Sequence, residues 1–353
     1  MRQEGLNLIV WVALGITLFI TLSLWIVPMF AVHQMTRAKR STYKNCFDLL
    51  ERYKIFSRQE FDQLDKEDVE IQSHDKLKLH GVYIEKYPRS NRVAIVVHGY
   101  TAALPWSSQF AAIFIKQGFN VLLVDQRGHG QSEGKHATFG YKEKYDLQGW
   151  VDWIVNRKGD DCVIALHGQS LGGATVLEYA AIHRPQVRCI IADCPYSDLF
   201  VLMKHLVSKM NHLPSWPFMK LINRRLKHKA NFSFEDVSPI EVMKNCKLPI
   251  LFIHGDKDVF VPTQMSLDLY EAKPEPKRLL LIDKAKHAVA YCTDQTQYEA
   301  EVLAFVEQVI GPPNRKDLIT SADLNTQPVY AFPIDTVAVP EAEPESSFVL
   351  SSY

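Results

Sequence analysis

A serine flanked by glycines is the feature of this sequence most able to do covalent chemistry. Gly168-Gln169-Ser170-Leu171-Gly172 matches the pattern Gly-x-Ser-x-Gly, follows a short apolar run and precedes a stretch with helical periodicity. In a nucleophile elbow the serine occupies a tight turn between a strand and a helix, where glycines two residues away on either side avoid steric clashes. The sequence therefore predicts that the hydroxyl of Ser170 is a nucleophile.

The same pattern occurs a second time, at Gly130-Gln131-Ser132-Glu133-Gly134. Ser132 lies well past the preceding apolar run, and no helical pattern follows it directly. A serine in that position would lack the helix N-terminus that supports an oxyanion. We therefore interpret Ser132 as a loop residue.

A serine nucleophile needs a general base, and on a strand–elbow–helix scaffold the chain order is serine, then acid, then histidine. His287 is the one histidine beyond residue 258, and it follows the last apolar run. Because the ends of parallel strands meet at one edge of a sheet, His287 is expected on the same edge as Ser170. The sequence predicts that His287 is the base.

The acid that orients His287 has more than one candidate. Asp256 and Asp258 both follow the apolar run at 250–253. An acid several residues past a strand has more freedom to turn toward the histidine, so Asp258 is favoured and Asp256 is the alternative. Asp193 and Asp198, which follow the preceding run, are more distant alternatives.

An acyl-transfer site also needs hydrogen-bond donors for the tetrahedral oxyanion. One donor on such a scaffold is the backbone N–H after the nucleophile, here that of Leu171. The other comes from the loop after an early strand, where His98-Gly99-Tyr100-Thr101 lies. We therefore expect the backbone N–H groups of Tyr100 and Leu171 to form the oxyanion hole, with the His98 imidazole holding the loop.

The elements that must position these residues alternate between strands and helices. Short continuous apolar runs are typical of strands buried on both faces of a parallel sheet. Such runs occur at 93–97, 121–124, 163–166, 189–192, 250–253 and 279–282, after an expected hairpin at 69–71 and 77–84. Helical patterns lie between them, at 110–117, 146–156, 171–183, 264–272 and 295–310. The sequence therefore predicts an α/β fold with a mostly parallel sheet flanked by helices.

One connection in this alternation is much longer than the others. Residues 196–248 separate two predicted strands and mix large apolar side chains with many bases. A connection of that length in a compact domain is usually a functional insertion. We expect a helical cap insertion over the edge of the sheet that carries Ser170.

The N-terminal region predicts a membrane anchor. Residues 5–32 contain no charged side chain, and the twenty residues 8–27 would span about 30 Å as a helix. Trp11 and Trp25 lie near the two ends, where indoles favour the headgroup region. The apolar stretch is longer than that of a cleaved signal peptide and has no convincing cleavage site. We predict an uncleaved, single-pass transmembrane helix at 6–32, and the bases that follow it favour a cytoplasmic domain.

The composition of the chain excludes some classes of protein. With 47% hydrophobic and 23% charged residues, the chain is not disordered over most of its length. Forty bases balance forty acids, so no nucleic-acid partner is expected. The six cysteines show no CxxC spacing, and no metal site is predicted.

The patterns along the chain also predict its domain organisation. We expect a juxtamembrane helical linker at 33–66, a catalytic domain at 67–310 and a disordered acidic tail at 311–353.

Several motifs occur together in order, and their combination is more specific than any one of them. They are His98-Gly99, the run from Asp125 to Ser132, the Ser170 elbow, the Asp258 loop ending at Val261-Pro262, and His287-Ala288. As a set they resemble the α/β-hydrolase superfamily, in its serine-aminopeptidase-like and monoacylglycerol-lipase-like branch. Residues 213–217 of the cap look like those of membrane-anchored bacterial members. The resemblance covers about residues 67–310 and implies the α/β-hydrolase fold, Asp258 as the acid, and a structural turn at 125–132.

The residues and the resemblance together predict a serine hydrolase that cleaves an ester through an acyl-enzyme. A membrane anchor beside an apolar, basic cap makes a lipid-like acyl ester a candidate substrate, and no metal or organic cofactor is required. Serine peptidases and thioesterases share the same fold and stay open as alternatives. A membrane-tethered binding module without turnover is the alternative from another class.

Overall fold

The computed structural model describes residues 2–37 and 40–320 of the protein, and eight strands there form one sheet. The order across the sheet is β1-β2-β4-β3-β5-β6-β7-β8. The strands are β1 (Lys66–Gln72), β2 (Lys78–Ile84), β3 (Arg92–Val97), β4 (Asn120–Val124), β5 (Val163–Gln169), β6 (Val187–Asp193), β7 (Ile250–Gly255) and β8 (Lys277–Ile282). Each predicted apolar run therefore lies in a strand.

The directions of the strands agree with the continuous apolar runs of the sequence, which predicted a mostly parallel sheet. The hairpin β1–β2 is antiparallel, and β2 also pairs antiparallel with β4. Every other neighbouring pair is parallel. All residues of β4 and β7 are buried, as expected for strands covered on both faces. The predicted mostly parallel sheet is confirmed, and the carboxyl ends of β3 to β8 meet at one edge.

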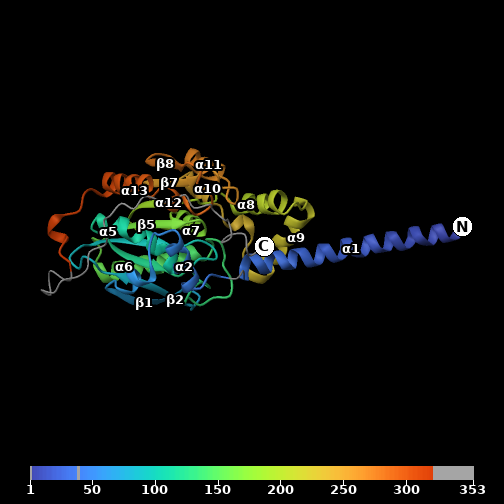
Figure 1. The fold of residues 1–353 in the computed structure, drawn as a ribbon, viewed down its shortest axis with the longest axis horizontal. Helices are drawn as coiled ribbons and strands as arrows, with labels where there is room; N and C mark the ends of the chain where they lie inside the picture. The colour runs from blue at the N-terminus through green and yellow to red at the C-terminus, as the bar shows by residue number, and fades with distance from the viewer. Residues whose placement is uncertain (1, 38–39, 321–353) are drawn as a thin grey trace.

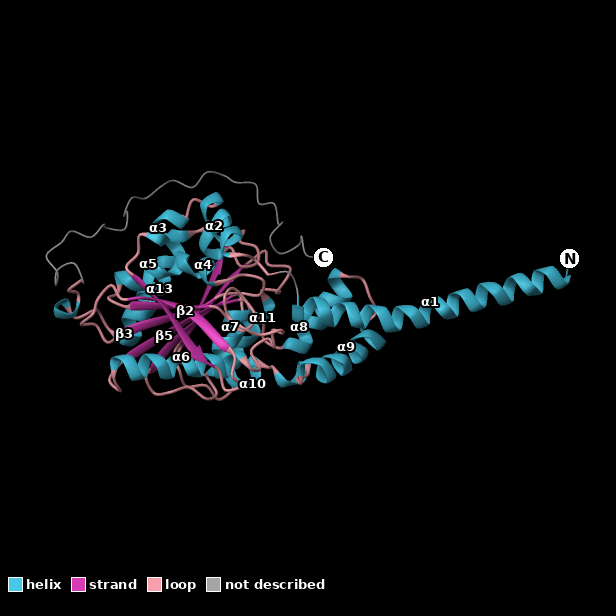
Figure 2. Ribbon diagram, turned by 90° about the horizontal axis from the view of Figure 1, so that it is seen from below, coloured by secondary structure: helices cyan, strands magenta, loops and turns pink. Residues whose placement is uncertain are grey.

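Helices cover both faces of the sheet, as Figures 1 and 2 show. One face packs against α2, α3, α4, α5, α12 and α13, and the other packs against α6, α7, α10 and α11. These helices are α2 (Tyr43–Arg52), α3 (Arg58–Asp62), α4 (Leu104–Ser107), α5 (Ala111–Lys116), α6 (Glu143–Lys158), α7 (Leu171–Tyr179), α10 (Pro239–Met243), α11 (Gln264–Ala272), α12 (Ala290–Thr293) and α13 (Gln295–Ile310). The helix expected at 171–183 ends at Tyr179 and is followed by a turn, so the predicted end was wrong. The prediction was too long because the apolar pattern continues through that turn.

The long connection between β6 and β7 is helical. It contains α8 (Leu199–His205), a π-helical turn (Leu206–Met210), α9 (Ser215–Ala230) and α10 (Pro239–Met243). An apolar cluster joins this cap to other parts of the chain, because Leu202, Ile222 and Leu226 pack with Val32 and with Leu171. The cap thus packs against the N-terminal helix and shares an apolar cluster with the residue after Ser170.

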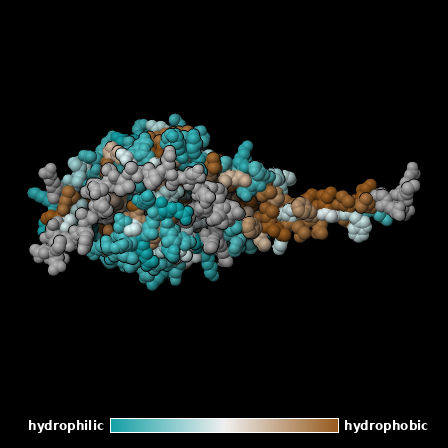
Figure 3. All heavy atoms as spheres, viewed as in Figure 1, coloured by the Kyte–Doolittle hydropathy of each residue, from teal (hydrophilic) through white to brown (hydrophobic). Residues whose placement is uncertain are grey.

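The N-terminal helix α1 (Arg2–Arg37) projects from the rest of the molecule. Its side chains from Asn7 to Leu22 are exposed and almost all apolar, so the projecting part forms the brown rod in Figure 3. Within the described residues, it is the one helix long and apolar enough to cross a membrane. The last turns differ, because Val32 and Thr36 are buried against the domain.

The segment expected as a linker packs into the domain. Cys46, Phe47 and Leu50 of α2 and Phe61 of α3 are buried in the core cluster on one face of the sheet. Both helices begin at capped residues: Thr42 accepts the N–H of Asn45, and Ser57 forms a capping box with Glu60. Of the predicted tail, residues 321–353 lie outside the described residues, so disorder there stays a prediction.

Candidate active site

Ser170 lies in the turn between β5 and α7 with a strained backbone, at φ 54° and ψ −113°. Its N–H donates to the Asp193 carbonyl at 2.8 Å, and its own carbonyl accepts the N–H of Ala174 at 2.9 Å. A Cβ at Gly168 would lie 2.2 Å from the Gly172 carbonyl oxygen, and one at Gly172 would lie 2.1 Å from that of Val97. The turn therefore requires both flanking glycines.

His287 and Asp258 reach Ser170 from two other loops. His287 follows β8, and its Nε2 lies 2.9 Å from the Ser170 Oγ. Its Nδ1 lies 2.6 Å from the Asp258 Oδ2, on the loop after β7. When Nδ1 carries the proton and donates a hydrogen bond to the Asp258 carboxylate, Nε2 presents a lone pair to the serine hydroxyl. The arrangement can therefore move a proton from Ser170 to His287.

Asp258 is held by several donors besides His287. Its Oδ1 accepts the N–H groups of Phe260 and Val261 at 3.0 and 2.9 Å. Burial alone would raise the pKa of the carboxyl, but the nearby His287 and His254 outweigh burial and lower the pKa below its ordinary value. Asp258 is therefore ionised at neutral pH and can hold the imidazole in orientation.

His254 is part of this site, although the sequence did not single out its side chain. Its Nε2 lies 3.1 Å from the Asp258 Oδ2 and 2.9 Å from the Val261 carbonyl oxygen. Its Nδ1 lies 2.6 Å from the Ser266 hydroxyl. The signal available in the sequence was its position, at the end of β7 and four residues before the acid.

The alternative acids have other contacts. The Asp256 carboxylate pairs with Lys257 at 2.8 Å. Asp198 accepts the N–H of Val201 at the start of α8. The Asp193 Oδ2 accepts the side-chain amide of Gln169 at 2.8 Å. The geometry thus brings Asp258, rather than Asp256, to His287.

The expected oxyanion loop lies against the nucleophile. A Cβ at Gly99 would lie 3.3 Å from the Ser170 Cβ, so the chain after β3 passes directly beside the serine. The Nε2 of His98 accepts the N–H of Gln126 at 3.0 Å and thereby holds this loop. The roles of the Tyr100 and Leu171 N–H groups stay predictions, on segments that the fold places at Ser170.

The Tyr100 side chain connects this loop to the N-terminal helix. Its hydroxyl lies 2.7 Å from the carbonyl oxygens of both Gln34 and Met35, in the last turns of α1. The backbone N–H of Ser41 also donates to the Thr101 carbonyl, at 2.6 Å. The end of the N-terminal helix is therefore in direct contact with the loop expected to bind the oxyanion.

The second glycine–serine motif is structural. The Ser132 hydroxyl donates to the Asp125 carbonyl at 2.7 Å and accepts the N–H of His80 at 2.8 Å. Ser132 thus ties its loop to β2 and to the residue that follows β4, as expected for a loop residue.

Two groups of possible metal ligands occur among the described residues: Cys194 with Asp258 and His287, and His74 with Asp75 and Asp146. In the first group the Asp258 and His287 atoms are hydrogen-bonded to each other. In the second, Arg127 pairs with both carboxylates, at 2.9 and 2.6 Å. In both groups the carboxylates already form hydrogen bonds or ion pairs within the protein, so neither group supports a metal site.

Asp193, whose carbonyl accepts the Ser170 N–H, should make the thermal stability of the protein depend on pH. Complete burial raises its pKa to about 6, and its Oδ1 has no hydrogen-bond partner among the described residues. Because the pKa of Asp193 is higher in the folded state, its contribution to the free energy of unfolding is full below the unfolded pKa, about 3.9. That contribution is lost as pH rises through about 6. Relative to Asp193→Asn, the wild type should therefore lose about 1 kcal/mol between pH 5 and pH 8, or roughly 2–4 °C in Tm.

Thermal melts of both proteins in one non-ionic detergent at pH 5, 6, 7 and 8 measure this difference. Any constant effect of the asparagine cancels, because only the change with pH is compared. Melting curves that shift in parallel over this range would contradict the prediction.

Comparisons with known proteins agree with the geometry. A model of the family described as serine aminopeptidase, S33, matches residues 88–238. The uncharacterized protein YqkD of Bacillus subtilis is 31% identical over 250 residues, which cover 70% of this chain and 82% of YqkD. Protein bem46 of Schizosaccharomyces pombe is 24% identical, over 66% of this chain and 73% of its own length.

Solved structures share the fold. The Pyrococcus furiosus esterase Pf2001 superposes with a TM-score of 0.56 at 25% identity, covering 72% of this chain and 97% of the esterase. The Pyrococcus horikoshii acylaminoacyl peptidase superposes with a TM-score of 0.56 at 18% identity, and the match covers 72% of this chain and 44% of the peptidase. At that identity the similarity shows the fold alone. The sheet, the elbow and these relatives together identify the chain as a hydrolase that belongs to the α/β-hydrolase superfamily and is related to the S33 serine aminopeptidases.

Proposed function

We propose that the protein is a membrane-anchored serine hydrolase that cleaves esters through an acyl-enzyme. The observation that carries the proposal is the hydrogen-bonded series from Ser170 Oγ through His287 to Asp258, at 2.9 and 2.6 Å. A serine in a strained elbow with a buried, ionised acid behind its histidine is the arrangement that activates a hydroxyl as a nucleophile.

In the proposed reaction, the Ser170 Oγ bonds to the ester carbonyl carbon while His287 Nε2 takes the hydroxyl proton. The negative charge on the carbonyl oxygen is met by the Leu171 and Tyr100 N–H groups. The bond to the leaving oxygen breaks as His287 returns the proton, and an alcohol departs. Water then gives a proton to His287 and attacks the acyl carbon, and Ser170 regains its proton as the carboxylic acid leaves.

An apolar acyl group is the substrate feature that we propose. Leu171, next to the nucleophile, belongs to the same apolar cluster as Phe139, Tyr196 and Leu202. The esterase Pf2001 is among the similar structures, which supports an ester as the substrate. The N-terminal helix is long and apolar enough to span a membrane, and anchoring there would bring the enzyme close to lipid-like esters. The cytoplasmic orientation of the domain stays a prediction.

Peptide hydrolysis is the second candidate, because the matching family model is described as a serine aminopeptidase. Peptide and ester bonds pass through the same tetrahedral intermediate, so the triad geometry does not select between them. The choice depends on the leaving group that the site accepts.

Hydrolysis of p-nitrophenyl esters from acetyl to palmitoyl by the full-length protein in detergent tests the proposal. Aminoacyl p-nitroanilides in the same assay test the peptidase candidate. We expect ester turnover, with covalent labelling of Ser170 by a fluorophosphonate detected by peptide mass spectrometry. Folded protein that turned over no ester and took no label would overturn the serine-hydrolase proposal, and turnover of anilides alone would favour the peptidase.

A further inference from the structure

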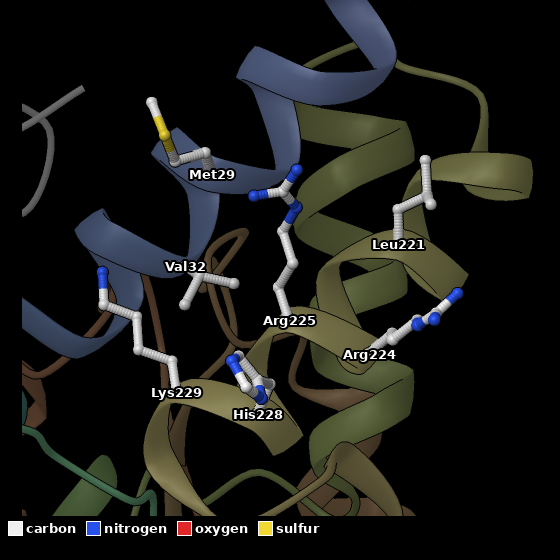
Figure 4. Close-up of a pocket in the computed structure, with 7 residues that line it drawn as sticks. All are labelled: Met29, Val32, Leu221, Arg224, Arg225, His228 and Lys229. Carbon is white, nitrogen blue, oxygen red and sulfur yellow. The ribbon is translucent and has the colours of Figure 1, made fainter.

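A groove lies between the last turns of α1 and the cap helix α9, as Figure 4 shows. Its volume is about 800 Å³. The lining residues are Met29 and Val32 from α1, and Leu221, Arg224, Arg225, His228 and Lys229 from α9. None of them belongs to the Ser170 site, so the groove is a separate feature of the molecule.

The groove combines an apolar side with a basic side. Arg225 and Lys229 extend from α9 toward α1 in Figure 4, and the guanidinium carbon of Arg225 lies 5.8 Å from the centre of the Trp25 ring. Among the described residues, Arg224, Arg225 and Lys229 form no ion pair with an acid. Guanidinium and ammonium groups that lack an acidic partner bind phosphate oxygens strongly.

The position of the groove along α1 identifies the molecule that would meet these bases. Exposed apolar side chains of α1 continue through Trp25 and Ile26 to Met29 and Phe30, while Pro28 and Val32 in the same stretch are buried. About 20 residues of helix span the hydrocarbon core, and tryptophans favour the headgroup level just outside it. Trp25 therefore marks the level of the lipid phosphates, and Arg225 lies beside it.

We propose that the groove binds the phosphate of an anionic phospholipid from the membrane that α1 spans, with the lipid's apolar part against Met29 and Val32. The proposal rests on the membrane anchoring in the proposed function and is independent of the hydrolytic reaction. Binding there would fix the cap, and with it the approach to Ser170, relative to the membrane surface.

Native mass spectrometry of the full-length protein in detergent, titrated with dioleoylphosphatidylglycerol or dioleoylphosphatidylcholine, tests the proposal. The groove variant is Arg224→Gln/Arg225→Gln/Lys229→Gln. The matched control, Lys204→Gln/Lys220→Gln/Lys227→Gln, removes three exposed bases of the cap outside the groove. Because Arg225 contacts Trp25, the double variant Arg224→Gln/Lys229→Gln is measured as well, and ester hydrolysis is recorded for every protein.

We expect the wild type and the control to prefer the anionic lipid, and the groove variant to bind it about 10- to 100-fold more weakly. The double variant should show an intermediate loss. Equal affinity of the wild type for both lipids, or equal losses in the groove variant and the control, would overturn the proposal. Displacement of the lipid by 10 mM inorganic phosphate would also overturn it, since the site would then bind free phosphate. Absence of ester hydrolysis in the wild type, with lipid binding intact, would count against the proposed reaction and leave this site standing.

Discussion

Ser170→Ala should lower kcat/KM for p-nitrophenyl esters by about 10⁴- to 10⁶-fold, with fluorophosphonate labelling abolished. Removing the Oγ leaves no atom to form the acyl-enzyme, and only binding and oxyanion stabilisation would assist attack by water. Alanine fits the elbow sterically, because it only removes an atom from a position that already carries a Cβ. Steady-state kinetics and labelling of the full-length variant measure the effect, and a melting curve verifies that it is folded.

Ser132→Ala is the matched control, since Ser132 lies in the other glycine–serine motif. Its hydroxyl makes two hydrogen bonds within a loop, so this variant should lose some thermal stability and keep the label on Ser170. Residual activity in Ser170→Ala within tenfold of the wild type would rule Ser170 out as the nucleophile.

Asp258→Asn should lower kcat by about 10³- to 10⁴-fold and leave KM little changed. The asparagine can keep the contacts from the Phe260 and Val261 N–H groups to Oδ1, so the loop should hold its shape. It cannot provide the negative charge that orients His287 and stabilises the imidazolium formed in the reaction. Separate determination of kcat and KM on one ester, with melting curves as the measure of folding, tests this expectation.

Asp256→Asn provides the comparison, because it also removes one carboxylate charge from the same loop. Its partner is Lys257, so activity should stay within a few-fold of the wild type. A larger loss in Asp256→Asn than in Asp258→Asn would contradict the assignment of the acid.

Much of the fold and part of the candidate site could be predicted from residue order alone. Strands buried on both faces require continuous apolar runs, and each run from 93–97 to 279–282 lies in a strand. The apolar run directly before Ser170 and the helical pattern directly after it distinguished its elbow from the same glycine–serine pattern at Ser132. Because the carboxyl ends of parallel strands share one edge, chain order alone placed Ser170 and His287 at the same edge, where their side chains lie 2.9 Å apart.

Other features depended on contacts between residues far apart in the chain, which no local pattern encodes. Position in the chain favoured Asp258 and left Asp256 as an alternative, because the direction of each side chain depends on the partners that surround it. Asp258 turns toward His287 because Phe260, Val261 and His254 hold its carboxylate, whereas Lys257 pairs with Asp256.

The N-terminal region shows the same limit on a larger scale. Its composition identified a helix able to span a membrane, because hydrophobicity and length are local properties. That the end of this helix meets Tyr100, more than sixty residues away, and forms a basic groove with α9 was decided by tertiary packing. Such contacts arise because burying Val32 against the cap and the domain stabilises one arrangement of otherwise separate elements.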